Sequence, residues 1–120
     1  MVVEEFDVID AAGLSPDGRV GLMMFEHRDW SDSAAQLQDL HKKCQAYLSY
    51  EVDGDMVRDN PQYADKPVWV RLVAQVLPPS PVLPYLSQLK NALAKHGVEF
   101  QLAHYNPADE STGVNNLVAI

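Results

Sequence analysis

The sequence predicts an α+β domain, a two-layer sandwich in which one mixed four-stranded sheet carries two helices on one face. Apolar segments of the kind that form strands alternate with two stretches in which apolar residues recur every three or four positions, the spacing of a helix face. The resulting order is ββαβαβ. A strand–helix–strand unit within one sheet prefers a right-handed crossover between parallel strands, which places both helices in a layer against the sheet.

Four segments carry the strand pattern. Residues 6–12 (FDVIDAA) and 19–26 (RVGLMMFE) flank the sequence Pro-Asp-Gly at 16–18, which is typical of a tight turn, so these two strands are predicted to form a hairpin. Residues 68–76 (VWVRLVAQV) are apolar and rich in β-branched side chains, which favours a central strand. Residues 98–105 (VEFQLAHY) alternate strictly and predict the fourth strand.

The first helix is predicted to begin at Ser31 or Asp32, because either side chain can accept hydrogen bonds from the unpaired N–H groups of the first turn. Apolar residues then recur at helical steps as far as Leu48, and Asp-Gly at 53–54 is a stop signal. Cys44 lies on this apolar stripe, where a small core residue is more common than a nucleophile.

The remaining segments define the domain organisation. Residues 53–67 are polar and predict a loop with one short helical turn, and a second helix is expected from residues 82–84 to Gly97. We therefore expect a single domain over residues 1–105, followed by a C-terminal tail over residues 106–120.

Composition narrows the classes of function. Seventeen acidic and nine basic residues give a formal net charge of −8, which disfavours nucleic acid and anionic membrane surfaces and favours a basic protein as a possible partner. A single cysteine cannot form an internal disulfide, which indicates a reducing, cytoplasmic location. No apolar run approaches the length of a transmembrane helix, and no sequence motif for a cofactor is present.

The sheet face opposite the helices is predicted to be unusually apolar. Alternation along the second and third strands places Met23, Phe25, Trp69 and Val73 on that face, interrupted by Arg71. This composition is typical of a protein interface, so we expect a homodimer that uses these five residues. The alternative is that the C-terminal tail folds back and covers the face.

The stretch FEHRDWSD, where the second strand leads into the first helix, is the candidate chemical site. His27 and Asp29 can act as a base and its orienting carboxylate beside Trp30, or they can simply join strand to helix; the sequence favours the structural role. Glu26, His27, Asp29 and Asp32 are suitable metal-ligand types but lack a metal-binding spacing, so no metal site is predicted.

The chain resembles a family of small bacterial proteins defined only as a domain of unknown function. The resemblance spans about residues 4–102 and rests on the segments DVIDAAG, HRDW, AYLSY and VRLVAQVLPP. It implies a bacterial source and assigns no activity, so no catalytic residue is transferred from it.

Together these observations favour a non-enzymatic protein-interaction module that dimerises. The alternative function is a small enzyme, or a ligand- or metal-binding protein, with its site around His27, Asp29 and Trp30.

Overall fold

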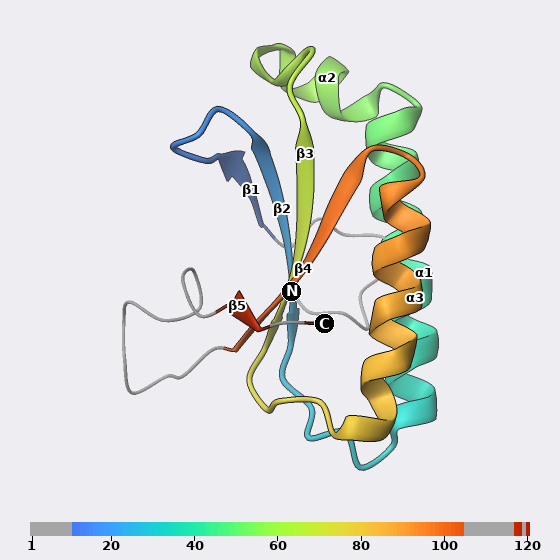
Figure 1. Ribbon diagram of the computed structural model, residues 1–120. Coiled ribbons are helices and arrows are strands. Elements are labelled where there is room, and N and C mark those ends of the chain that lie inside the picture. The colour runs from blue at the N-terminus through green and yellow to red at the C-terminus, as the bar shows by residue number, and fades with distance from the viewer. Residues whose placement is uncertain (1–10, 105–116, 119) are drawn as a thin grey trace.

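A computed structural model describes residues 11–104, 117–118 and 120, and it shows one mixed sheet with the two long helices on the same side (Figure 1). The elements are β1 (Ala11–Leu14), β2 (Val20–Glu26), α1 (Ser33–Val52), α2 (Asp55–Asp59), β3 (Val68–Ala74), α3 (Leu83–Ala94), β4 (Val98–His104) and β5 (Leu117–Val118), with 3₁₀ turns at Pro61–Tyr63 and Ser80–Val82.

The five strands lie in the order β1-β2-β3-β4-β5. β1 and β2 form an antiparallel hairpin, while β3 is parallel to both of its neighbours. Each parallel pair is joined by one long helix, α1 or α3, which confirms the predicted α+β class and the central position of β3. Residues 6–10 of the expected first strand and 106–116 of the expected tail lie outside the described residues.

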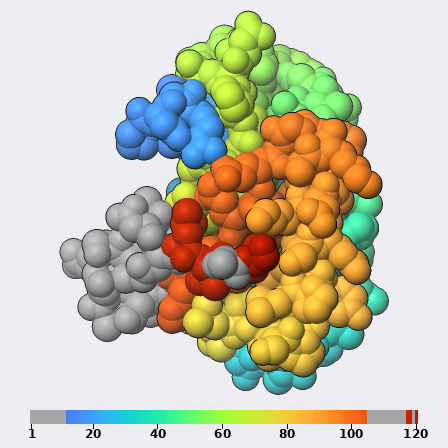
Figure 2. All heavy atoms as spheres, in the orientation of Figure 1, coloured from blue at the N-terminus to red at the C-terminus, as the bar shows by residue number. Residues whose placement is uncertain are grey.

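Within the described residues the sheet has one strand more than predicted. Leu117 and Val118 form β5, which pairs antiparallel with Ala103 and Leu102 of β4. A strand of two residues is too short to show alternation in the sequence. The sequence pattern therefore leaves these two residues in the predicted tail. Figure 2 shows this segment (red) beside α3, where the Lys90 ammonium donates to the main-chain oxygen of Ile120 at 3.3 Å.

The ends of both long helices follow the predicted signals. The Asp32 carboxylate caps α1 by accepting from the Ala35 N–H at 3.3 Å. Gly54 follows the end of α1 with a φ of 85°, and Gly97 follows α3 with a φ of 75°. Both angles lie in the left-handed region that glycine adopts without a steric penalty, which explains why each helix stops there.

The core lies between the helical layer and the sheet. The Tyr47 hydroxyl of α1 reaches the sheet and donates to the main-chain oxygen of Met23 at 2.7 Å. Both helices and the three central strands contribute fully buried apolar side chains, among them Val20, Leu22, Met24, Leu40, Leu72, Leu86, Phe100 and Leu102.

The sheet face opposite the helices carries the residues that were predicted for it, but Trp69 and Val73 are less exposed to solvent than predicted. The strand register pairs Gly21 with Trp69 and Phe25 with Val73, so these residues share that face. Within the single chain Trp69 is only 6% exposed and Val73 only 2%, whereas Met23 and Phe25 are half-buried. The Trp69 ring lies over Gly21, where a Cβ atom would come within 2.2 Å of it.

Candidate functional site

The junction between β2 and α1 is held by a buried carboxylate. Glu26 is 2% exposed and accepts from Arg28 through Nε at 2.8 Å, Nη2 at 2.9 Å and the main-chain N–H at 3.0 Å. Arg28 also donates through Nη1 to Asp39 of α1 at 2.9 Å. Paired N–H donors from one guanidinium are a strong and directional way to hold a carboxylate. The network therefore fixes the end of the strand to the second turn of the helix.

The residues predicted as a chemical site are also engaged in shaping the junction. The Asp29 carboxylate accepts from the Ser31 N–H at 3.0 Å, and hydrogen bonds from Ser31 hold the pKa of Asp29 below its usual range. Trp30 is buried, adopts a φ of 69°, and donates its indole N–H to the Val76 oxygen at 2.8 Å. His27 is exposed at the rim.

A hollow of about 450 Å³ lies against this junction, where α1 begins. His27, Asp29 and Asp32 line it together with Gln36, a buried residue whose Nε2 has no hydrogen-bond partner. Among the described residues, no group of three or more His, Cys, Asp and Glu side chains is arranged to hold a metal ion. The polar groups of Glu26, Arg28, Asp29 and Trp30, whose hydrogen bonds are given above, are bonded to other residues of the same chain. This arrangement is the one expected of a structural junction.

A second polar cluster lies on the sheet face that carries Trp69. The Arg71 guanidinium stacks over the Trp69 ring at 4.3 Å and donates to Gln101 at 2.9 Å, and burial lowers the pKa of Arg71. Gln101 donates to Glu99 at 3.0 Å, and Glu99 also accepts from Arg19 at 2.6 Å. These contacts link β4 to β3 and to the hairpin turn before β2, so this cluster too connects strands.

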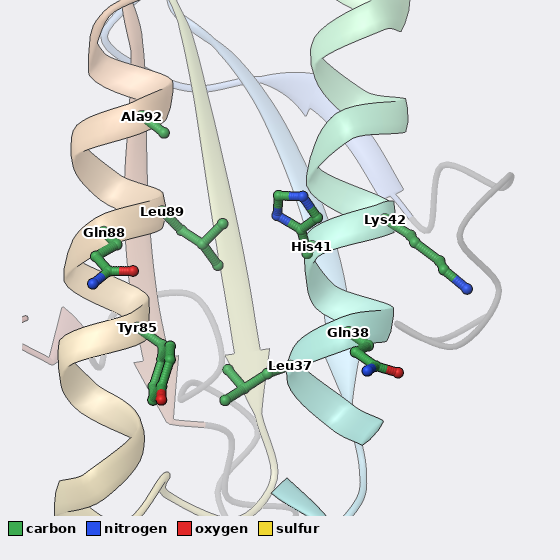
Figure 3. A pocket seen from close by; sticks show the side chains of 8 residues that line it. All are labelled: Leu37, Gln38, His41, Lys42, Tyr85, Gln88, Leu89 and Ala92. Carbon is green, nitrogen blue, oxygen red and sulfur yellow. The ribbon is translucent and has the colours of Figure 1, made fainter. Parts of the chain in front are cut away.

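An apolar depression lies between α1 and α3. We call it the α1–α3 groove; it comprises two adjoining hollows of about 530 and 190 Å³. Figure 3 shows Leu37 and His41 of α1 and Tyr85 and Leu89 of α3 pointing into the space between the helices, while Lys42 points away from it. The full lining is Leu37, Gln38, His41, Lys42, Cys44, Gln45, Leu48, Tyr85, Gln88, Leu89, Ala92, Leu93 and His96.

The groove follows a regular pattern along both helices. Each helix supplies residues at relative positions 0, 4, 7 and 11, which form one continuous stripe on a helix surface. Tyr85 is 54% exposed, although aromatic side chains of this size are usually more buried. The two stripes are Leu37, His41, Cys44 and Leu48 on α1, and Tyr85, Leu89, Ala92 and His96 on α3 and the turn that follows it.

Charge is distributed unevenly around this groove. None of the described residues that line it is acidic. α1 and residues 83–97, which include all of α3, hold four lysines, one of them the buried Lys43, and two acidic residues, Asp39 and Glu51. Their formal charge is +2 in a chain whose total is −8, and the positive charge comes from the α3 segment, which holds no Asp or Glu.

The apolar spacing of the sequence does not predict this groove. It places Cys44 and Leu48 on the same stripe of the first helix as the residues that pack on the sheet, so it does not separate the groove residues from the core. The detectable signal was the absence of Asp and Glu from the α3 segment LPYLSQLKNALA, which is unusual for an exposed helix in an acidic chain.

These observations define a small two-layer α+β domain with a groove in its helical layer. Residues 1–106 match the model of a family described as a family of unknown function (DUF6572), and the chain belongs to that family. This confirms the resemblance found from the sequence segments. Comparisons with curated proteins and with solved structures gave no match. Within the described residues, no helix combines the length and apolar character needed to cross a membrane.

Proposed function

We propose that the domain is a non-enzymatic protein-interaction module and that the α1–α3 groove is its docking surface. The observation that carries this proposal is the lining of the groove, in which apolar side chains are bordered by glutamine, histidine and lysine without a described carboxylate. An accessible apolar depression with a polar border is the composition expected of a binding surface.

The shape of the groove fits a helix. The stripe on α1 runs from Leu37 to Leu48, eleven steps along the chain that rise about 16 Å at 1.5 Å per step. This length accommodates about three turns of a partner helix. An amphipathic helix whose apolar face lies in a groove between two helices is a recurrent mode of peptide recognition.

Self-association through the opposite sheet face is the other form that such an interaction can take. Met23 and Phe25 are half-buried neighbours of the more deeply buried Trp69, Arg71 and Val73. A homodimer on that face would use Met23 and Phe25 directly and the other three residues as their support. Sedimentation velocity from about 10 to 200 μM, well above the dissociation constant of a stable dimer, tests this form.

The alternative of a catalytic or ligand-binding site at His27, Asp29 and Trp30 is less well supported. Asp29 is bound by Ser31, and Trp30 is buried against the main chain at Val76. We therefore assign this stretch a structural role within the proposal.

The docking proposal is tested with a synthetic amphipathic helix that has a leucine-rich face and an uncharged glutamine face. We expect it to bind the wild-type domain in a calorimetric titration. Ala92→Glu should abolish binding, because it places a carboxylate inside the groove. Ala94→Glu is the matched control, since Ala94 is exposed on the same helix outside the groove lining. Equal binding by both variants, or no binding by wild type, would contradict the proposal.

A further inference from the structure

We propose that the partner of the α1–α3 groove is an acidic amphipathic helix, one with an apolar stripe flanked by Asp or Glu. This inference rests on the proposed function, because it names the partner of the same groove. The formal net charge of the whole chain points toward a basic partner, but the groove belongs to the part of the chain that carries net positive charge.

The arrangement of side chains specifies where the charges of the partner would lie. Leu37, Tyr85 and Leu89 occupy the space between the helices, so they would contact the apolar stripe. Lys42 points away on the outer side of α1, where it would meet a flanking carboxylate of the partner. His41 and His96 both line the narrower hollow and offer further donors to acidic groups.

The α3 segment adds positive charge without any acidic residue. Lys95 is the C-cap of α3, one residue before the lining residue His96, whereas Lys90 of α3 donates to the main-chain oxygen of Ile120 at 3.3 Å. Of the two acidic residues of α1, Asp39 already accepts a hydrogen bond from Arg28 at 2.9 Å, and Glu51 lies beyond Leu48, the last lining residue on that helix. A field of one sign along a groove favours partners of the opposite sign mainly through the rate of association and through selectivity.

A second copy of this chain fits the groove less well. Its described long helices are α1 and α3, and these carry the same basic side chains as the groove itself. Juxtaposing two such layers brings like charges together, which disfavours that pairing. An acidic helix from a different protein satisfies both the apolar stripe and the charge.

The experiment compares three peptides that share one leucine-rich face and differ only in their flanking residues, which are Glu, Gln or Lys. At 50 mM salt the Glu peptide should bind about tenfold more tightly than the Lys peptide, the effect of two or three exposed ion pairs acting together. The difference should shrink at 500 mM salt, because exposed charges are then screened.

Isosteric variants locate the charge effect. Gln45→Glu combined with Gln88→Glu adds two carboxylates to the groove lining without changing side-chain size, and it should weaken the Glu peptide several-fold. Gln62→Glu combined with Gln75→Glu adds the same charge at exposed positions outside the lining and should leave binding nearly unchanged. Circular dichroism confirms that all variants are folded.

The outcomes separate the two proposals. Equal affinity for the Glu and Lys peptides, with the Gln peptide still bound and still sensitive to Ala92→Glu, would overturn the acidic partner and leave the docking surface in place. Tighter binding of the Lys peptide would also overturn it. Failure of all three peptides to bind would overturn both proposals. This holds even if a fatty acid such as dodecanoate binds in the groove, because the proposed occupant is a peptide helix.

Discussion

Trp30 shows at the scale of one residue how the junction between β2 and α1 is fixed. Its ring is buried and its indole N–H is paired with the Val76 oxygen, so it joins the start of α1 to the chain leaving β3. We expect Trp30→Ala to cost about 3–5 kcal/mol of unfolding free energy, as for other buried aromatic residues.

Trp30→Phe separates packing from hydrogen bonding. It keeps an aromatic ring but leaves the Val76 oxygen without its donor, so its cost should be smaller than that of Trp30→Ala, about 1–3 kcal/mol. Urea unfolding measures both variants. A loss below about 0.5 kcal/mol for Trp30→Ala, a value typical of surface positions, would show that the ring does not stabilise the fold.

Cys44 lies at the floor of the groove, and its burial raises the pKa of the thiol from 9.0 to about 12. The thiolate is the reactive form, so a disulfide reagent at pH 8 should label the native protein only as fast as it opens. Immediate labelling of folded protein, at the rate of an unfolded control in urea, would contradict this placement.

The same pKa shift has a consequence for stability. The folded state retains the Cys44 proton above pH 9 while the unfolded state loses it, so this contribution to stability is full below pH 9 and falls as the pH rises toward 12. A Cys44→Ala variant should lack this component of the alkaline decline, and the comparison removes the effects of other groups that titrate there.

At the scale of elements, β2 and β3 are fitted together through Gly21. The Trp69 ring occupies the space that a Cβ atom would need, at 2.2 Å. Gly21→Ala should therefore destabilise the domain by about 1–3 kcal/mol, the cost of overpacking. Gly13→Ala is the matched control, because a Cβ on Gly13 of β1 meets nothing within 4 Å.

A double variant identifies the cause. Trp69→Leu removes the ring that meets the new methyl group, so Gly21→Ala should cost less in that background than in wild type. Thermal or urea unfolding of the four proteins gives the coupling. Strictly additive losses would mean that the ring and the glycine do not contact each other in the folded protein.

The elements themselves could be predicted because their signals are local. Caps and stops such as Asp32, Gly54 and Gly97 act within one turn, and the alternation of β2 and β3 assigned the correct residues to each sheet face. The strand register could not show how deeply Trp69 is buried, because exposure depends on what the rest of the chain places over a face.

The sites were harder to predict because they join distant segments. His27 and Asp29 were found as a pair because they are adjacent in sequence, yet the contact that fixes the junction runs from Glu26 through Arg28 to Asp39. The groove depends on the distance between two helices that are separated by residues 53–82 of the chain, and no local sequence pattern encodes that distance.

At the scale of the whole molecule, the net charge does not show how the charged residues are distributed along the chain. A total of −8 predicts an acidic surface, whereas α1 and residues 83–97 together carry a formal charge of +2. The charges that select a partner are those within about 8 Å of the contact, the screening length at physiological salt. The predicted basic partner and the proposed acidic helix therefore concern different surfaces of one protein.

The strand order β1-β2-β3-β4-β5 is also the order in which a ribosome synthesises the strands. Each strand pairs with the strand made just before it. No later strand therefore has to insert between two strands that have already been synthesised. A sheet extended in this way exposes one new edge at a time, and each crossover helix is made before the strand that follows it. β5, two residues long, pairs with β4 after the strands that precede it have been made.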